Sequence, residues 1–577
     1  MADKFKIVLC WHMHQPDYYN SHSKQYQLPW TYLHGIKDYV EMAAHLEAVP
    51  NACAVVNFAP TLLEQLDDYV KQIQAFLRDA TPLQDPLLAA LNSSPPYAPF
   101  LNQLNLEDSN NTLDSDNIKR MACLKLTEQC LRAHPEQMIQ RFEPYKALAE
   151  VAGSLKQNPN MMSYLDDQYL TDLVMWYHLA WFGETVRRSD VRIQALIDKG
   201  RTFNDQDRRQ LTEIIGELLS SIVPRYSKLA DRGQVELSVT PYAHPIMPLL
   251  LDMCSAHEAM PDVNLEGVGC YPDGKDRVRW HMQEGISVFE QHFGRKPDGC
   301  WPSEGCVSET VIRLMEEFDI RWIASGGQVL QNSLKKAGKE GQPPHRPYYL
   351  PNSPVRCFFR DDYLSDLIGF EFSKWHGDDA VANLIQHFEN IARNASKTSE
   401  TVASIILDGE NAWEHYSHNA YYFLSTLYEK LADHPEIELT TFSKCLDAGI
   451  TELSTLVAGS WVHGTFSTWI GDRDKNRGWQ MLIEAKHLFD KIAPRLSPAQ
   501  RKAAEHQLAL CEGSDWCWWF GDCNPSEAVH DFDNLYRIHL KHLYRLLGET
   551  PPDYLNHSFT HGGGNPATGG VMRRGQE

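Results

Sequence analysis

The chain lacks the features that mark membrane and nucleic-acid-binding proteins. No apolar run in its 577 residues approaches the length of a membrane-spanning helix, and Ile7–Trp11 is too short for a signal-peptide core. Basic residues are in the minority, with 54 Lys and Arg against 76 Asp and Glu and a formal net charge of −22. Phosphate backbones and anionic lipids both need a basic surface. We therefore expect a cytoplasmic protein, with no nucleic-acid or membrane partner, that acts on a neutral substrate.

Cysteine pairs with the spacing of a metal or disulfide framework are also missing. The 13 cysteines include no Cys-x-x-Cys pair, and their scattered positions fit neither a zinc ribbon nor a small secreted scaffold. We interpret them as reduced thiols and expect no metal and no cofactor. The length is too great for one hydrophobic core, so two or three structural units are expected.

Seven short, β-rich apolar runs alternate with segments of helical spacing. Strands that alternate with helices predict a parallel sheet covered on both faces. Seven such units come close to the eight of a closed TIM barrel. The predicted strands are Phe5–Trp11, Cys53–Phe58, Gln234–Thr240, Asp298–Trp301, Ile320–Ser325, Val355–Arg360 and Val402–Leu407.

Two long segments fall outside this alternation. Residues 61–232 are rich in helical pattern, and we interpret them as a helical insertion after the second strand. From about residue 419 onward we expect helices and no further buried strand. The sequence thus predicts a barrel over residues 1–418, a helical domain over 419–555 and a disordered tail over the glycine-rich residues 556–577.

Two acidic residues follow the ends of predicted buried strands. Glu304 comes after the fourth strand, and Asp408 closes the seventh. Either acid alone could cap a helix. However, the carboxyl ends of barrel strands meet on one face, and a carboxylate there is costly unless it is solvated, paired or used. Because each lies beside tryptophan, the two suggest a carboxylate pair that acts on a sugar.

Other strand ends carry polar residues that could join this pair. His12 and His14 follow the first strand, and alternate strand positions point the same way, which suits a metal or a hydroxyl-rich ligand. The third strand carries Glu236 and leads to His244. The sixth ends in an Arg-Asp pair that, taken alone, is typical of an ordinary ion pair.

Five short motifs occur in a defined order along the chain. They are His12-Met13-His14-Gln15-Pro16, Gly233–Leu237, Trp301–Glu304, Leu407–Asn411 and Phe466–Gly471. Together they resemble glycoside hydrolase family 57. The resemblance implies an incomplete (β/α)7 TIM-like barrel, followed by a helical region that helps to close the active-site cleft.

The resemblance also implies a retaining mechanism with Glu304 as the nucleophile and Asp408 as the general acid/base. Retention requires two carboxyl groups roughly 5–5.5 Å apart, with the acid protonated and the nucleophile ionised. Glu410 is an alternative for the acid role, because it lies two residues after Asp408. Residues expected to bind sugar, from the motifs and from tryptophans near the strand ends, are His12, His14, Glu236, His244, Trp301, Arg360, Asp361, Trp413, Trp469 and Trp516.

The implied activity is hydrolysis of α-1,4-glucosidic bonds in α-glucans by an α-amylase-type enzyme. A 4-α-glucanotransferase or an α-glucan branching enzyme is the near alternative, because it differs only in the acceptor of the glycosyl group. A distant alternative is a metal-dependent hydrolase with His12, His14, His244 and Asp408 as ligands, since imidazole and carboxylate form a plausible zinc set.

Overall fold

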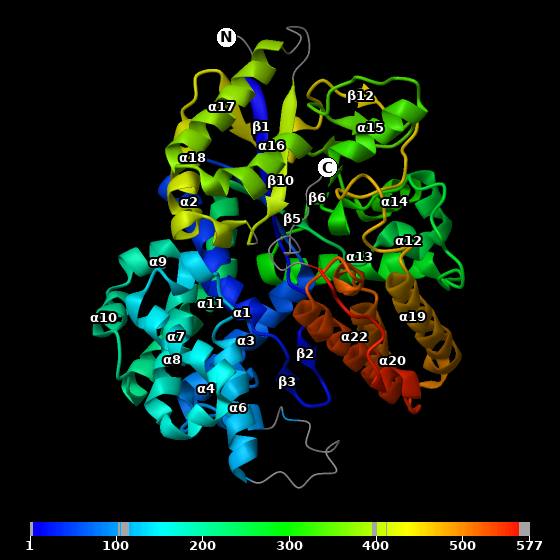
Figure 1. The fold of residues 1–577 in the computed structure, drawn as a ribbon. Coiled ribbons are helices and arrows are strands. Elements are labelled where there is room, and N and C mark those ends of the chain that lie inside the picture. Colours follow the sequence, from blue (N-terminus) through cyan, green and yellow to red (C-terminus); the bar gives the residue numbers. More distant parts are fainter. Residues whose placement is uncertain (1–3, 102–103, 105–114, 395–400, 411, 565–577) are drawn as a thin grey trace.

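A curled parallel sheet occupies one end of the protein, and two helical lobes extend from it (Figure 1). The structure, a computed structural model, describes residues 4–101, 104, 115–394, 401–410 and 412–564. One lobe is formed by the segment between the second and third barrel strands, and the other by the C-terminal helices. Both lie on the side to which β1 and β10 run, so they can contribute walls to a site at the strand ends.

All seven predicted strands are present, and they are neighbours in the order β10-β1-β4-β5-β6-β7-β9. Among the described residues, the two ends of this row meet at one parallel bridge, between Arg360 and Ser404. This confirms the predicted incomplete (β/α)7 barrel. The strands are β1 (Phe5–Met13), β4 (Ala54–Phe58), β5 (Val235–Val239), β6 (Gly299–Cys300), β7 (Trp322–Ser325), β9 (Arg356–Phe359) and β10 (Val402–Asp408).

Helices cover the outside of this sheet, as expected for strands that are buried on both faces. β1 pairs with β10, β4 and β11, and its residues from Ile7 to Met13 are buried. These helices are α1 (Trp30–His34), α2 (Val40–Ala48), α12 (Met247–Leu251), α13 (Gly274–Phe293), α14 (Glu309–Met315), α15 (Gly327–Lys336), α16 (Asp362–Asp366), α17 (Gly377–Asn394) and α18 (Tyr421–Ala432).

The sheet continues beyond residue 419, where we expected only helices. β11 (Ile437–Thr440) pairs in parallel with Phe5–Val8 of β1, and β12 (Thr451–Glu452) pairs with β8 (Tyr348–Tyr349). The expectation of helices alone after residue 419 is therefore wrong. These strands are short and partly exposed, so they leave no apolar run in the sequence. A small antiparallel pair, β2 (Tyr19–Asn20) and β3 (Gln25–Tyr26), follows β1.

The predicted insertion after the second strand is a lobe of helices. Its longest member is α11, in which the side chains of Asn204 and Asp207 form a reciprocal capping box at the N-terminus. Packing of α11 against the barrel helices α2 and α13 attaches the lobe to the barrel. The helices are α3 (Pro60–Asp79), α4 (Pro86–Asn92), α5 (Ala98–Leu101), α6 (Ser115–Gln129), α7 (Glu143–Gln157), α8 (Asp167–Trp181), α9 (Glu184–Ser189), α10 (Val191–Lys199) and α11 (Asp205–Asp231).

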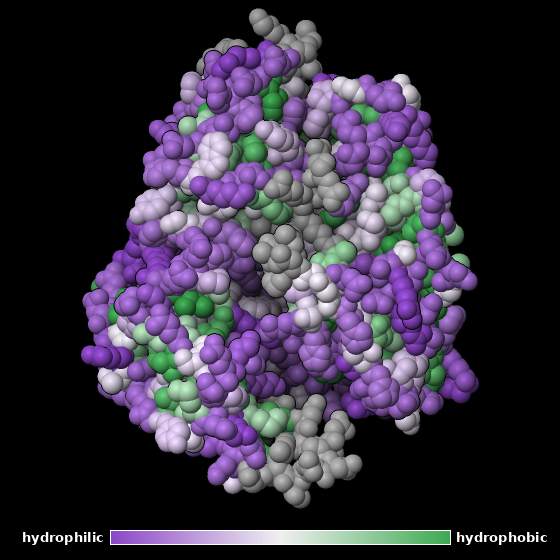
Figure 2. Space-filling model, in the orientation of Figure 1, coloured by the Kyte–Doolittle hydropathy of each residue, from purple (hydrophilic) through white to green (hydrophobic). Residues whose placement is uncertain are grey.

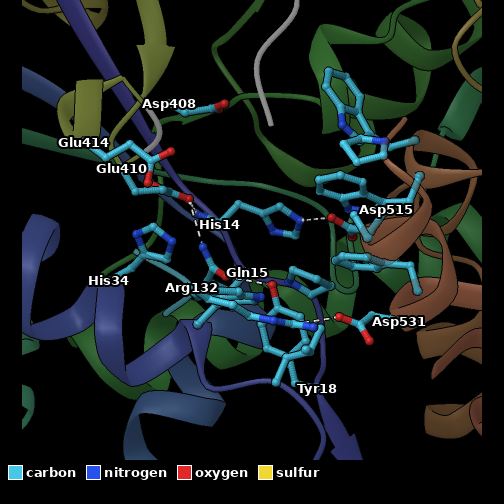
Figure 3. A pocket seen from close by; sticks show the side chains of 18 of the residues that line it. His14, Gln15, Tyr18, His34, Arg132, Asp408, Glu410, Glu414, Asp515 and Asp531 are labelled. Carbon is cyan, nitrogen blue, oxygen red and sulfur yellow. Dashed lines mark hydrogen bonds and ion pairs between the residues drawn. The ribbon is translucent and has the colours of Figure 1, made fainter. Parts of the chain in front are cut away.

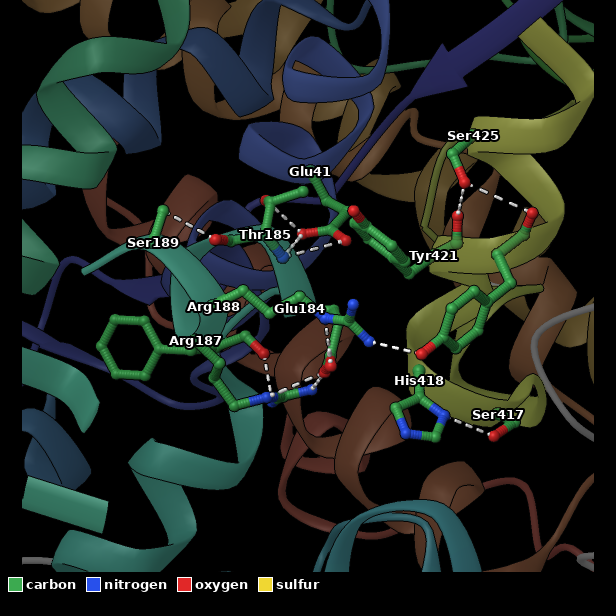
Figure 4. Close-up of polar contacts among 12 residues, drawn as sticks. Glu41, Glu184, Thr185, Arg187, Arg188, Ser189, Ser417, His418, Tyr421 and Ser425 are labelled. Atoms are coloured by element: carbon green, nitrogen blue, oxygen red, sulfur yellow. Dashed lines mark hydrogen bonds and ion pairs between the residues drawn. The ribbon is translucent and has the colours of Figure 1, made fainter. Parts of the chain in front are cut away.

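Polar contacts fix the insertion to the barrel helices at α9 (Figure 4). The buried carboxylate of Glu41 in α2 accepts hydrogen bonds from the backbone N–H and the hydroxyl of Thr185. Arg188 donates to Glu184 in its own helix and to the hydroxyl of Tyr422 in α18, at 2.8 Å in each case. Because these groups belong to different segments, they fix the angle at which the insertion leaves the barrel.

The C-terminal lobe is joined to the barrel by a buried ion-pair network. The Glu512 carboxylate accepts from the guanidinium of Arg277 at 2.8 Å, from His281 at 2.7 Å and from the Tyr271 hydroxyl. Residues 557–564, predicted to be disordered, instead contact α22 and the segment between α21 and α22, so that part of the prediction is wrong. The remaining tail lies outside the described residues. The helices are α19 (Arg473–Ile492), α20 (Pro498–Cys511), α21 (Asp515–Trp519) and α22 (Ser526–Leu546).

Across the described ranges, no helix combines the length and apolar character needed to cross a bilayer.

Candidate active site

A cleft of about 660 Å³ opens at the carboxyl ends of the barrel strands. The space-filling view shows the surface hollowed near the middle of this face (Figure 2). The insertion supplies one wall, including Arg132 and Trp181, and the C-terminal lobe supplies another, including Asp515 and Asp531. Figure 3 shows His14 reaching Asp515, and Arg132 reaching Asp531 across the two walls. The site is therefore assembled from all three parts of the chain.

Glu304 enters the cleft from a strained turn after β6. Its backbone lies in the left-handed region at φ 57°, ψ 24°, a conformation that costs a glutamate roughly 1–3 kcal/mol. The next residue, Gly305, also has positive φ, and a Cβ there would lie 3.0 Å from the ring of Trp301. The turn is held by Trp461, whose backbone N–H donates to the Glu304 carbonyl and whose indole Nε1 donates to Oε2, both at 3.1 Å.

Asp408 reaches the same cleft from the last residue of β10. It is paired in register with His12 of β1, and Gly409 N donates to the His12 carbonyl at 2.7 Å. Glu410 also lines the cleft, but its Oε1 accepts from the backbone N–H of His14 and from Gln15. Burial, reinforced by the charge of Asp408, raises the pKa of Glu410 well above its usual range.

The Ser514–Asp515 corner of the C-terminal lobe completes the site. Its backbone pairs with the His244 loop, since Ser514 N donates to the His244 carbonyl at 2.9 Å. Gly513 permits this approach, because a Cβ there would lie 2.9 Å from the Ala243 carbonyl oxygen. Ser514 Oγ lies 3.2 Å from Oε1 of Glu304, so the lobe contacts the candidate nucleophile directly.

Three histidines surround the carboxylates. His12 Nε2 lies 3.2 Å from His244 Nε2, and the His14 ring stacks on the His244 ring with centroids 3.9 Å apart and planes 20° apart. Among the described residues these form the single group of three or more side chains close enough to share a metal ion. They do not fit a three-histidine site, because an ion about 2.0–2.1 Å from a nitrogen of one stacked ring lies outside the plane of the other.

The electrostatic environment of the cleft favours a protonated Glu304. Burial raises the pKa of Glu304 to about 8, and the charges of Asp515 and Asp408 add to this effect. We expected an ionised Glu304, so the unliganded site differs from that expectation. For His14, burial acts to lower the pKa, but the charge of Asp515 and its 2.8 Å hydrogen bond raise it above the usual value. His14 and Asp515 thus form an ion pair beside the two candidate catalytic acids.

Four tryptophans expected to bind sugar are packed beneath the cleft. Trp301 lies against Trp461, with ring centroids 5.4 Å apart, and Trp413 donates to the Gly409 carbonyl at 3.0 Å. Trp469 and Trp516 are likewise buried in the C-terminal lobe. None of the four is among the described residues that line the cleft, so their expected sugar contacts have no support in the structure. The indoles that line it are Trp30, Trp181, Trp461, Trp518 and Trp519.

Three charged residues expected to bind sugar also lie outside the cleft. Glu236 is near the start of β5, at the opposite end of the barrel, where it accepts from Trp322 Nε1 and from Ser443. Arg360 is buried and pairs with two aspartates of α16, while Asp361 caps that helix and contacts His345. Their partners are intramolecular, and their positions support a structural role.

Of the twelve predicted site residues, five line the cleft: His12, His14, His244, Glu304 and Asp408. Ser514 and Asp515 were not among the predicted site residues, and Trp461 was noted only as one of several tryptophans near the strand-end loops. Trp461 and Ser514 lie in turns that follow a glycine, and Asp515 begins α21. What the sequence could not provide was the pairing of these turns with the His244 and Glu304 loops.

Comparison with known proteins agrees with this architecture. Similar solved structures include a GH57-type branching enzyme from Pyrococcus horikoshii (17% identity, 96% of this chain and 92% of that one, TM-score 0.55) and a GH57 branching enzyme from Thermococcus kodakaraensis (16%, 96% and 92%, 0.54). The α-amylase AmyC from Thermotoga maritima is also similar (14%, 96% and 96%, 0.52). At these identities the likeness concerns the fold.

No curated protein sequence matches the chain. The family model described as glycosyl hydrolase family 57 matches residues 8–454, which is most of the barrel and insertion. The chain therefore belongs to glycosyl hydrolase family 57.

Proposed function

We propose that this protein is a retaining glycoside hydrolase that cleaves α-1,4-glucosidic bonds in α-glucans, in the manner of an α-amylase. The observation that carries the proposal is the meeting of Glu304 and Asp408 in one cleft at the ends of β6 and β10. Two carboxyl groups, one protonated and one ionised, are the requirement of a double-displacement mechanism.

In the first step, the Glu304 carboxylate attacks the anomeric carbon while Asp408 protonates the departing glycosidic oxygen. A covalent glycosyl-enzyme forms and the C–O bond to the leaving sugar breaks. In the second step, Asp408 takes a proton from water, whose oxygen attacks the anomeric carbon and releases Glu304. Trp461 and Ser514, as donors to Glu304, stabilise its ionised form.

The raised pKa of Glu304 provides the proton that the mechanism needs. With that value at about 8, Glu304 holds a proton at neutral pH in the unliganded cleft, and in the proposed mechanism the Glu304–Asp408 pair shares this proton. The mechanism needs that proton on Asp408. Positive charge that develops at the anomeric carbon favours an ionised carboxylate beside it, so the reacting substrate itself draws the pair toward the active arrangement.

The choice of an α-glucan rests on the family and on the cleft. The solved relatives named above are branching enzymes and an α-amylase. The indoles in the cleft offer flat apolar faces on which sugar rings can stack. A 4-α-glucanotransferase or branching enzyme would use the same two acids and differ in the acceptor.

Product analysis tests the proposal. The protein is incubated with maltoheptaose and with soluble starch, with and without EDTA, beside Glu304→Gln and Asp408→Asn. We expect shorter maltooligosaccharides from the wild type, with or without EDTA, and none from either variant. Glu410→Gln is the matched control, and loss of activity there with retention in Asp408→Asn would reassign the acid. Longer products indicate glucan transfer, and no turnover by folded protein contradicts the proposal.

A further inference from the structure

A continuous chain of hydrogen bonds leads from the floor of the barrel to Glu304. Asn57 Oδ1 lies 2.6 Å from His12 Nδ1, and His12 Nε2 lies 3.2 Å from His244 Nε2. His244 Nδ1 then lies 2.8 Å from Ser514 Oγ, which is 3.2 Å from Glu304 Oε1. All five side chains are between 0 and 8% exposed.

Each histidine and the serine in this hydrogen-bond chain can donate only one proton. A neutral imidazole donates with one nitrogen and accepts with the other, and a hydroxyl donates once. Burial lowers the pKa of His12 to about 3, and burial lowers that of His244 well below its usual value, so both rings are neutral. The hydrogen-bond chain can therefore adopt only two arrangements of its protons, which we call proton orders. The direction in which the first hydrogen bond is donated dictates the direction of the last.

In the first order, the Asn57 carbonyl accepts from His12, and every donor points away from Glu304. Ser514 then donates its hydroxyl proton to His244. Its contact with Glu304 is therefore a hydrogen bond only if the Glu304 carboxyl group is protonated. In the second order, the Asn57 amide nitrogen donates to His12. Every donor now points toward Glu304, and Ser514 donates to an ionised carboxylate.

The surroundings of Asn57 accommodate both orders. Its other contacts are the hydroxyls of Ser238, at 3.1 Å, and Thr240, at 3.0 Å, which can donate or accept. Thr240 Oγ also lies 2.7 Å from the Trp301 carbonyl. One hydroxyl proton cannot serve that carbonyl and the Asn57 carbonyl together. With the amide turned over, Thr240 donates to Trp301 and accepts from Asn57, and each group has a partner.

We propose that Asn57 is a positioning residue which, through the two histidines and Ser514, sets whether the shared proton rests on Glu304 or on Asp408. The inference rests on the proposed function, in which only the second arrangement is active. Between the two orders, the proton of each histidine moves from one ring nitrogen to the other. The number of protons on Asn57, the two histidines and Ser514 stays the same, because the proton lost by Glu304 is the one gained by Asp408.

Other groups also face Glu304. The charges of Asp515 in α21 and Asp408 in β10 raise its pKa, whereas His14 after β1 and the Trp461 N–H lower it. Asp515, His14 and Trp461 make the same contribution in both orders, and the charge of Asp408 acts only while Glu304 carries the proton. The hydrogen-bond chain from Asn57 is the part whose donors reverse between the two orders.

A double-mutant cycle separates this coupling from a simple charge effect. Asn57→Asp, ionised beside a neutral His12, presents only acceptor atoms to that ring and imposes the first order. We expect kcat/KM on maltoheptaose to fall about tenfold or more and its basic limb to move up by about one pH unit. In the Ser514→Ala background the link to Glu304 is cut, so the same substitution should leave the pH profile unchanged. A shift of equal size in both backgrounds would overturn the inference.

Two additions keep the test decisive. If Asn57→Asp does not fold, Asn57→Leu takes its place in the same cycle, because it removes the donor and the acceptor together. The carboxyl ¹³C resonance of Glu304, identified by its absence from Glu304→Gln, is titrated in each variant. This titration needs no turnover. Absence of activity on α-glucans with the coupling intact would therefore reject the proposed function and leave the inference standing.

Discussion

Replacement of Trp461 by phenylalanine should shift the proton between the two acids of the cleft. The indole Nε1 of Trp461 donates to Glu304 Oε2 at 3.1 Å, and Trp461→Phe removes this donor while an aromatic ring remains. A hydrogen bond to a charged group contributes about 1.5–3 kcal/mol, and 1.36 kcal/mol corresponds to one pKa unit. The pKa of Glu304, already raised to about 8, should therefore rise by roughly 1–2 further units.

The consequence for activity follows from the shared proton. A less stable Glu304 carboxylate reduces the fraction of enzyme with the proton on Asp408, so kcat/KM on maltoheptaose should fall about 10–100-fold. The basic limb of its pH profile should move upward by the same 1–2 units. Kinetics between pH 5 and 10.5 would measure both effects.

Trp301→Phe is the matched control for this experiment. Trp301 packs against Trp461, and its Nε1 has no hydrogen-bond partner within the described part of the chain. The same change of ring there should reduce stability and leave the pH limbs in place. If the two variants shift the basic limb equally, or if Trp461→Phe does not shift it, the assigned role of the indole N–H is refuted.

Three further outcomes test other parts of the structure. Glu512→Ala leaves Arg277 buried without its main partner and should cost about 3–5 kcal/mol in urea unfolding, whereas Glu505→Ala should cost far less. Burial acts to raise the pKa of Glu512, but Arg277 and His281 hold it below the usual value. This stability is therefore present above about pH 4.3 and lost as the pH falls, and an acid-insensitive wild type would contradict it. Glu236→Ala should destabilise the barrel by about 1–3 kcal/mol with kcat/KM unchanged. A loss of turnover would indicate instead that Glu236 takes part in the active site. EDTA should leave activity on maltoheptaose unchanged, since the stacked histidines cannot share one ion, and activity restored by a divalent metal would reject that argument.

The barrel could be predicted from sequence because its strands are buried on both faces. Such strands appear as continuous apolar runs, and all seven were identified, including two-residue β6. Strands β11 and β12 escaped because they are short and partly exposed, and their pairing with distant strands leaves no local pattern.

The candidate site was predictable where it follows strand ends. Glu304 and Asp408 follow buried strands, and topology alone brings such residues to one face. Trp461 and Ser514 come from loops whose approach depends on tertiary contacts, such as the close fit at Gly513. Glu236 shows the limit of this argument, since it belongs to a predicted strand but lies near its amino end and does not line the cleft.

The central claim is that Glu304 forms a covalent bond to sugar during turnover. The most direct test is mass spectrometry of peptides from the enzyme quenched during reaction with a slow α-glucosyl fluoride substrate. The account predicts one added glycosyl mass on the peptide that contains Glu304, and none in Glu304→Gln. A glycosyl group attached instead to Asp408 or Glu410, or turnover that continues in Glu304→Gln, would contradict it.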